Sequence, residues 1–113
     1  MEKTSYSEKI AQKALEMGAI RLSPQKPFCW ASGYYMPIYN DNRTLLGDWE
    51  ARKMIASAFG EILSSIGFDP DNIAGTSTAG IPHATTLSDM LHKPLTYIRS
   101  SGKDHGLKNQ IEG

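Results

Sequence analysis

Apolar residues recur every three to four positions near the start of the chain and predict an amphipathic helix over Thr4–Met17. Ser5 and Glu8, three residues apart, form a capping box that marks where this helix begins. Gly18 stands where a left-handed residue commonly ends a helix. The apolar positions form one narrow stripe, which consists of Ile10, Ala11, Ala14 and Leu15.

The same spacing is clearest over Asp48–Ile66, where we expect a second helix. Asp48 is a good N-cap residue, and Gly67 ends the pattern. The apolar positions of this helix are Ala51, Met54, Ile55, Ala58, Phe59, Ile62, Leu63 and Ile66.

A short apolar run over Asn72–Thr76 predicts a buried strand, and Ile81-Pro82 opens a further helix, with proline at a tolerated first-turn position. We expect the buried face of this helix to consist of Ile81, Ala84, Leu87 and Leu91. Lys93-Pro94 breaks the helix, and Leu95–Arg99 is the next strand. Helix, strand, helix and strand with short connections predict an α/β fold with a parallel sheet, whose ligands bind at the carboxyl ends of the strands.

Between the first two helices, residues 19–43 are extended and rich in turns, so we expect a small, irregular β-element there. Tyr34 and Tyr35 lie beside the turn at Gly33 and are candidates for stacking on a flat ring, while Lys26 could meet a carboxylate or phosphate. These aromatic residues could equally form the core of the β-element. We expect core positions for Trp30 and Tyr39, packing for Trp49, and a buried, unreactive position for Cys29.

Composition excludes several classes of protein. The 113 residues carry 12 Lys and Arg against 12 Asp and Glu, so no bulk charge favours nucleic acid or an anionic membrane. The lone Cys29 excludes an internal disulfide framework and fits a reducing compartment. No signal-peptide pattern and no apolar run of the ~20 residues that a membrane span needs is present. A cytoplasmic protein without membrane or nucleic-acid partners is the expectation.

Small residues fill the turn between the strand that ends at Thr76 and the helix that follows, over Gly75–Ile81. Such residues let backbone N–H groups approach a phosphate, and the helix N-terminus adds a favourable dipole. The turn matches neither a Walker A loop nor a dinucleotide-binding glycine fingerprint. A tight strand-to-helix turn without a ligand is an equal alternative on this stretch alone.

A cationic, glycine-punctuated loop follows the last strand and carries Arg99, Lys103, His105 and Lys108. Its glycines favour a mobile lid that closes over an anion, with Arg99 at the strand end suited to a bidentate phosphate contact. A merely solvated basic loop is the alternative. His92 and His105 are too far apart in sequence, without a third ligand nearby, to indicate a metal site.

Taken together, three segments that span nearly the whole chain resemble the orotate phosphoribosyltransferase family of type I phosphoribosyltransferases. These segments are Phe28-x-x-Ala-Ser-Gly-x-x-x-Pro-Ile-Tyr-x-Asp-x-Arg43, Gly75-x-x-x-Ala-Gly-Ile-Pro82 and Arg99-x-x-x-Lys-Asp-His-Gly106. The resemblance implies a single, C-terminally incomplete domain, in which residues 1–43 form a helix and a small N-terminal hood. Residues 44–113 would form the front part of the parallel α/β core and end in the catalytic loop.

The resemblance also implies an activity: transfer of phosphoribosyl from 5-phospho-α-D-ribose 1-diphosphate (PRPP) to orotate, giving orotidine 5'-monophosphate and pyrophosphate in UMP biosynthesis. Mg²⁺ would accompany the pyrophosphate donor. The family forms homodimers, in which the loop of residues 99–113 would reach the neighbouring active site. The implied catalytic residues are Arg99, Lys103 and His105.

Substrate contacts follow from the same resemblance. Tyr34 and Tyr35 would bracket orotate, and Lys26 would reach PRPP from the hood. Thr78 and Ala79 fall on the loop that holds pyrophosphate, where some members carry Tyr-Lys, so backbone contacts are expected there. Arg99, Lys103 and His105 would also contact PRPP or pyrophosphate.

The strand with paired acidic residues and the Thr/Gly-rich loop that the family places after its catalytic loop have no counterpart in these 113 residues. We therefore expect no turnover by this polypeptide alone. Two alternatives stay open: a phosphoribosyltransferase-fold regulator that senses a nucleotide, and a catalytically silent module that dimerises or binds a partner.

Overall fold

The structure is a computed structural model that describes residues 5–101 and 110–113. The chain divides into two compact units, residues 1–51 and residues 52–113, and each is described by itself. In the described ranges, no helix is both long enough and apolar enough to cross a membrane.

The first unit begins with helix α1, Tyr6–Met17. The Ser5 side chain caps it by accepting a hydrogen bond of 3.2 Å from the backbone N–H of Glu8. At the other end Gly18 has a φ of 78°, a left-handed conformation that glycine adopts without strain, and its N–H donates to the last turn of the helix. The predicted first helix and both of its end signals are confirmed.

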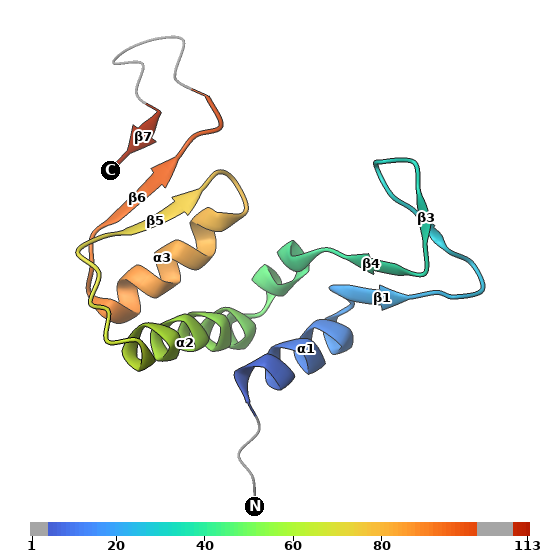
Figure 1. Ribbon diagram of the computed structural model, residues 1–113, viewed down its shortest axis with the longest axis horizontal. Helices are drawn as coiled ribbons and strands as arrows, with labels where there is room; N and C mark the ends of the chain where they lie inside the picture. The colour runs from blue at the N-terminus through green and yellow to red at the C-terminus, as the bar shows by residue number, and fades with distance from the viewer. Residues whose placement is uncertain (1–4, 102–109) are drawn as a thin grey trace, which may run out of the picture. The chain divides into compact units, whose positions relative to one another are not determined.

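Short antiparallel ribbons follow α1 (Figure 1). Strand β1, Ile20–Leu22, pairs with β4, Ile38–Asn40, and β2, Phe28–Cys29, pairs with β3, Tyr35–Met36. The predicted irregular β-element over residues 19–43 is thus confirmed. The chain then forms a 3₁₀ helix, Asn42–Gly47, before the start of α2.

The core positions expected for Trp30 and Tyr39 are wrong, because these side chains are 36% and 38% exposed. The indole N–H of Trp30 donates a 2.9 Å hydrogen bond to the carbonyl oxygen of Ile38, which keeps the ring at the rim of the ribbons. Tyr39 packs one side of its ring against Phe28, with ring centroids 5.8 Å apart. Cys29 is exposed, not buried as expected, in a strand of only two residues.

Helix α2, Trp49–Ser65, begins one residue later and ends one residue earlier than predicted. Asp48 accepts a hydrogen bond of 3.2 Å from the N–H of Glu50, as an N-cap should, and its other oxygen lies 2.8 Å from Nζ of Lys13 in α1. This ion pair raises the pKa of Lys13, chiefly through the hydrogen bond to Asp48. After α2, Gly67 takes a φ of 67° and ends the helix.

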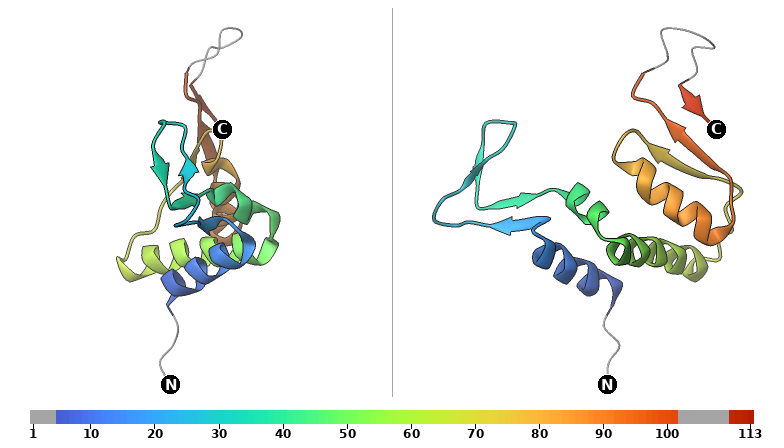
Figure 2. Two further views of the ribbon diagram at one scale, coloured as in Figure 1. Left: turned by 90° about the vertical axis from the view of Figure 1, so that its right-hand side faces the viewer. Right: turned by 180° about the vertical axis from the view of Figure 1, so that it is seen from behind.

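A small mixed sheet forms the body of the second unit (Figures 1 and 2). Strands β5, Ile73–Thr76, and β6, Leu95–Ile98, are parallel, as predicted, and helix α3, Gly80–Leu91, connects them. Strand β7, Ile111–Glu112, runs antiparallel to β6, so the sheet that contains the predicted parallel pair is mixed.

The core of this unit lies where β5 and α3 approach each other closely. Buried Ala56, Ile73, Ala84 and Leu87 form it, with Leu91 and Leu95 packed against them. A Cβ atom at Gly75 would lie 2.8 Å from both the Cβ of Ala84 and the carbonyl oxygen of Gly80. Glycine at this position therefore lets the first turn of α3 lie directly on the strand, which sets the shape of the connecting turn.

Candidate functional site

The turn from Thr76 to Gly80 joins the carboxyl end of β5 to the N-terminus of α3. Ser77, Thr78 and Ala79 are exposed, and no described side chain caps α3 at Ala79. Backbone N–H groups at an uncapped helix start need another acceptor, and an anion supplies one. The peptide bond between Ser77 and Thr78 is cis. The turn is an exposed stretch of small residues at an uncapped helix start, which we call the anion cradle after the ligand predicted for it. Anion binding there stays a prediction.

Arg99 lies at the same edge of the sheet as this turn. In the parallel pairing, Thr76 at the end of β5 is opposite Ile98 at the end of β6, and Arg99 follows directly. The N–H of Ser77 donates a hydrogen bond of 2.8 Å to the carbonyl oxygen of Ile98, which ties the turn to the end of β6. The fold therefore brings Arg99 to the carboxyl ends of both strands, where ligands bind in such sheets.

The remaining cations predicted on the loop, Lys103, His105 and Lys108, lie outside the described residues. Their assignment to the catalytic loop stays a prediction. The described flanks of the loop are Arg99–Ser101 and Gln110, and a short antiparallel ladder pairs β6 with β7 across its base.

The residues predicted to bind orotate lie in the first unit. Tyr34 and Tyr35 are 69% and 71% exposed, and Lys26 is exposed too. Trp30 closes the turn that carries the tyrosines: its N–H donates to the carbonyl oxygen of Tyr34, and its own carbonyl oxygen accepts from the N–H of Gly33, both at 2.8 Å. Tyr34 and Tyr35 are thus presented on a turn that is held closed by its own backbone.

The Asp41-x-Arg43 part of the first segment has a local role. Nε and a terminal nitrogen of the Arg43 guanidinium donate hydrogen bonds of 2.8 and 2.9 Å to the two carboxylate oxygens of Asp41. Asp41 also accepts from the N–H of Arg43 at the start of the 3₁₀ helix. The hydrogen bond from Arg43 is the largest cause of the lowered pKa of Asp41. Arg43 is therefore engaged in shaping the chain after β4.

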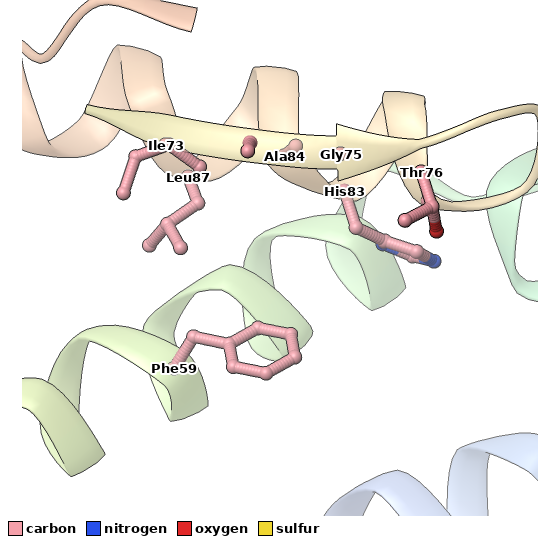
Figure 3. Close-up of a pocket in the computed structure, with 9 residues that line it drawn as sticks. Phe59, Ile73, Gly75, Thr76, His83, Ala84 and Leu87 are labelled. Atoms are coloured by element: carbon pink, nitrogen blue, oxygen red, sulfur yellow. The ribbon is translucent and has the colours of Figure 1, made fainter. Parts of the chain in front are cut away.

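His83 is a residue that sequence reasoning did not single out. It projects from the first turn of α3 into an open cavity of about 320 Å³ between β5, α3 and Phe59 of α2 (Figure 3). Its Nδ1 atom is buried, without a hydrogen-bond partner among the described residues. Burial, and secondarily the charge of Arg52, lowers the pKa of His83. The only sequence signal was a titratable residue between two positions of the predicted apolar face, Ile81 and Ala84.

The described residues offer no group of three or more His, Cys, Asp or Glu side chains that could hold a metal ion. The turn at residues 76–80 carries hydroxyl groups and backbone amides but no carboxylate. A divalent cation at this turn would need ligands from the bound anion itself, which is how Mg²⁺ is commonly held beside substrate phosphates.

Comparison with known protein sequences finds relatives that share one name, orotate phosphoribosyltransferase. The chain is 50% identical over 109 residues to the orotate phosphoribosyltransferase of Lactococcus lactis subsp. cremoris and 47% identical over 109 residues to that of Listeria monocytogenes. Each match covers 96% of this chain and 52% of the relative. The chain thus spans about half the length of the curated relatives it matches. No protein-family model matches the chain.

Comparison with solved structures also finds orotate phosphoribosyltransferases. The crystal structure of orotate phosphoribosyltransferase from Aeropyrum pernix superposes with a TM-score of 0.73 at 31% identity, covering 91% of this chain and 56% of that one. This protein carries the same name as the sequence relatives. By sequence and by fold, the chain is a homologue of the orotate phosphoribosyltransferases, with the type I phosphoribosyltransferase fold, over about half of their length.

Proposed function

We propose that this chain forms the orotate and pyrophosphate part of an orotate phosphoribosyltransferase, which transfers phosphoribosyl from PRPP to orotate. The observation that carries the proposal is the shared position of the small-residue turn and Arg99 at one edge of the sheet, in a chain 50% identical to a protein of that name. An exposed turn of small residues beside an arginine whose backbone is anchored in the sheet suits a pyrophosphate group.

In this proposal, the backbone N–H groups of Thr78 and Ala79 hold the pyrophosphate of PRPP, with Arg99 contacting it from the end of β6. Lys103 and His105 approach the same group from the loop. In the first unit, Lys26 contacts PRPP, while Tyr34 and Tyr35 stack on the orotate ring. The exposure of both tyrosines supports a role in binding, because an exposed aromatic pair offers its faces to a flat ligand.

The reaction needs no covalent nucleophile. A ring nitrogen of orotate forms a bond to the anomeric carbon of the ribose and loses its proton, while the bond from that carbon to the pyrophosphate oxygen breaks and its electron pair leaves with pyrophosphate. Negative charge grows on the leaving group, so fixed cationic donors lower the barrier. Arg99, Lys103 and His105 are the donors that this chain would supply.

Mg²⁺ is part of the proposal because the donor carries a pyrophosphate. When bound, it would offset charge on the leaving oxygens. The hydroxyls and amides of residues 76–80 would then contact the pyrophosphate oxygens that the cation leaves free. We further propose that the enzyme is a homodimer in which the loop of residues 99–113 serves the neighbouring site. We also propose a cytoplasmic enzyme, in line with an exposed, unpaired Cys29.

A chimera tests this function directly. The chain replaces the half of the Lactococcus lactis enzyme that it matches, and orotate-dependent release of pyrophosphate from PRPP is measured. We expect turnover by the chimera and none by the 113-residue polypeptide alone. A well-folded chimera that binds PRPP but releases no pyrophosphate would favour the regulator, and one that binds neither substrate would favour a dimerisation module.

A further inference from the structure

The side chain of Gln110 is bound to the residue whose guanidinium the proposed function uses. Its Nε2 donates a hydrogen bond of 3.3 Å to the carbonyl oxygen of Arg99. In the opposite direction, the N–H of Arg99 donates a 2.8 Å hydrogen bond to the carbonyl oxygen of Gln110. Both backbone polar groups of Arg99 are therefore satisfied by one residue, eleven positions further along the chain.

The end of β6 is held from its other side as well. The N–H of Ser77, in the anion cradle, donates to the carbonyl oxygen of Ile98, immediately before Arg99. Ile98 also pairs with Ile111, next to Gln110, in the antiparallel ladder. The backbone at Ile98–Arg99 therefore lies between the cradle on one side and β7 on the other, and a shift of either neighbour would move Arg99 relative to the cradle.

The hydrogen bond from the Gln110 side chain satisfies a backbone group of Arg99 that the β6–β7 ladder leaves without a partner among the described residues. The backbone pairing of β6 with β7 covers Tyr97 and Ile98 opposite Glu112 and Ile111 and is completed by the N–H of Arg99. The carbonyl oxygen of Arg99 points to no backbone donor among the described residues and is satisfied by the Gln110 amide. Without that amide, the peptide unit after Arg99 is free to rotate, because a backbone carbonyl at the surface can exchange its partner for water.

We propose that Gln110 is a positioning residue, which holds Arg99 in register with the anion cradle and so sets the geometry of its pyrophosphate contact. The proposal rests on the proposed function for its ligand and on the two hydrogen bonds for its geometry. Gln110 itself is exposed and acts through Arg99, without touching substrate.

The test uses the 113-residue chain and the variants Gln110→Ala and Gln110→Met, which remove the donor without adding charge. Methionine keeps the length of the side chain. Gln12→Ala is the matched control, because Nε2 of Gln12 makes an exposed hydrogen bond of the same 3.3 Å length to Glu16 in α1. For each protein, amide hydrogen exchange at Arg99, the dissociation constant for inorganic pyrophosphate in MgCl₂ and the thermal midpoint are measured.

We expect both Gln110 variants to speed exchange at the Arg99 amide by about two- to tenfold, as for loss of one neutral hydrogen bond. Pyrophosphate binding should weaken by a similar factor while the thermal midpoint stays near that of the unaltered chain. Gln12→Ala should leave exchange and binding unchanged. A merely structural role would lower the thermal midpoint without a specific loss of affinity, and that pattern would overturn the proposal.

Two failures are distinguishable. Unchanged exchange at Arg99 in both Gln110 variants would overturn the positioning role, whatever the chain binds. If the unaltered chain does not bind pyrophosphate, the proposed anion site is wrong. The proposal that Gln110 sets the pyrophosphate contact of Arg99 is then wrong as well.

Discussion

The backbone N–H of Ser77 donates a 2.8 Å hydrogen bond to the carbonyl oxygen of Ile98, although the two residues belong to different strand ends. This bond joins the first residue after β5 to the last residue of β6. It extends the parallel ladder by one step beyond the strands and holds the small-residue turn against the start of the cationic loop. The part of the proposed site in the second unit is therefore built into the sheet, and its geometry depends on how closely β5, β6 and α3 pack.

Gly75→Ala should destabilise the chain by about 1–3 kcal/mol, as overpacking does, because the added Cβ would lie 2.8 Å from the carbonyl oxygen of Gly80. Gly60→Ala, in the middle of α2 with open space around it, should instead stabilise by about 0.5–1 kcal/mol. Urea unfolding of both variants measures the difference. Equal effects would show that the contact at Gly75 does not constrain the fold.

Protonation of His83 should weaken the fold at acidic pH. Burial holds the pKa of His83 in the folded state below its ordinary value of 6.5, so the unfolded chain takes up a proton at a higher pH than the folded chain does. This contribution to stability is complete above that value and is lost as pH falls from 6.5 towards the folded pKa. The free energy of unfolding of His83→Gln should depend less on pH over this range. Parallel pH profiles for the two proteins would contradict the prediction.

Lys103→Ala in the active chimera should lower kcat on the order of 10²-fold or more, because one fixed donor to the leaving pyrophosphate is lost. Lys53→Ala, an exposed lysine on α2, serves as the control and should leave kcat unchanged. Steady-state pyrophosphate release measures both. A near-normal rate for Lys103→Ala would remove this residue from its proposed role.

Trp30→Phe should raise the KM for orotate in the chimera, by about two- to tenfold, because the indole N–H that holds the tyrosine turn to Ile38 is lost. Trp49→Phe is the matched control, since this tryptophan is 61% exposed and lies at the start of α2. The KM for PRPP should change little in either variant. An unchanged KM for orotate would separate the turn from orotate binding.

Local signals predicted the helices well. Ser5, Gly18, Asp48 and Gly67 act within one turn of their own helix end, so their effect can be recognised in the sequence without knowledge of the fold. The parallel pairing of β5 with β6 followed from the alternation of strand and helix. The helix ends thus depend on signals within one turn, and the parallel pairing depends on the order of the elements along the chain.

The features that the sequence did not predict depend on partners in other helices or strands, whatever their separation along the chain. Strand β7 has only two residues, Ile111–Glu112, and exists because β6 offers an edge to pair with. Trp30 was expected in a core by its size, yet the position of the Ile38 carbonyl decides where its ring lies. His83 became visible only when β5 and α2 formed the cavity around it. Of the expected site residues, the fold brings Thr78 and Ala79 to the same edge as Arg99, and their roles stay predictions.

The return of the chain at β7 has a practical consequence for engineering. Because Arg99 and Gln110 are joined by two hydrogen bonds, the ends of the intervening stretch are set by the sheet and not by the length of that stretch. The entropic cost of joining two anchored ends grows slowly with the number of residues between them, by about 0.6 kcal/mol for each doubling. Residues inserted between Ser101 and Gln110 should thus leave the β6–β7 register intact. The anchored ends should therefore keep Arg99 and Gln110 paired in variants that alter the predicted catalytic residues Lys103 and His105, so that such variants report on chemistry and not on the fold of the sheet.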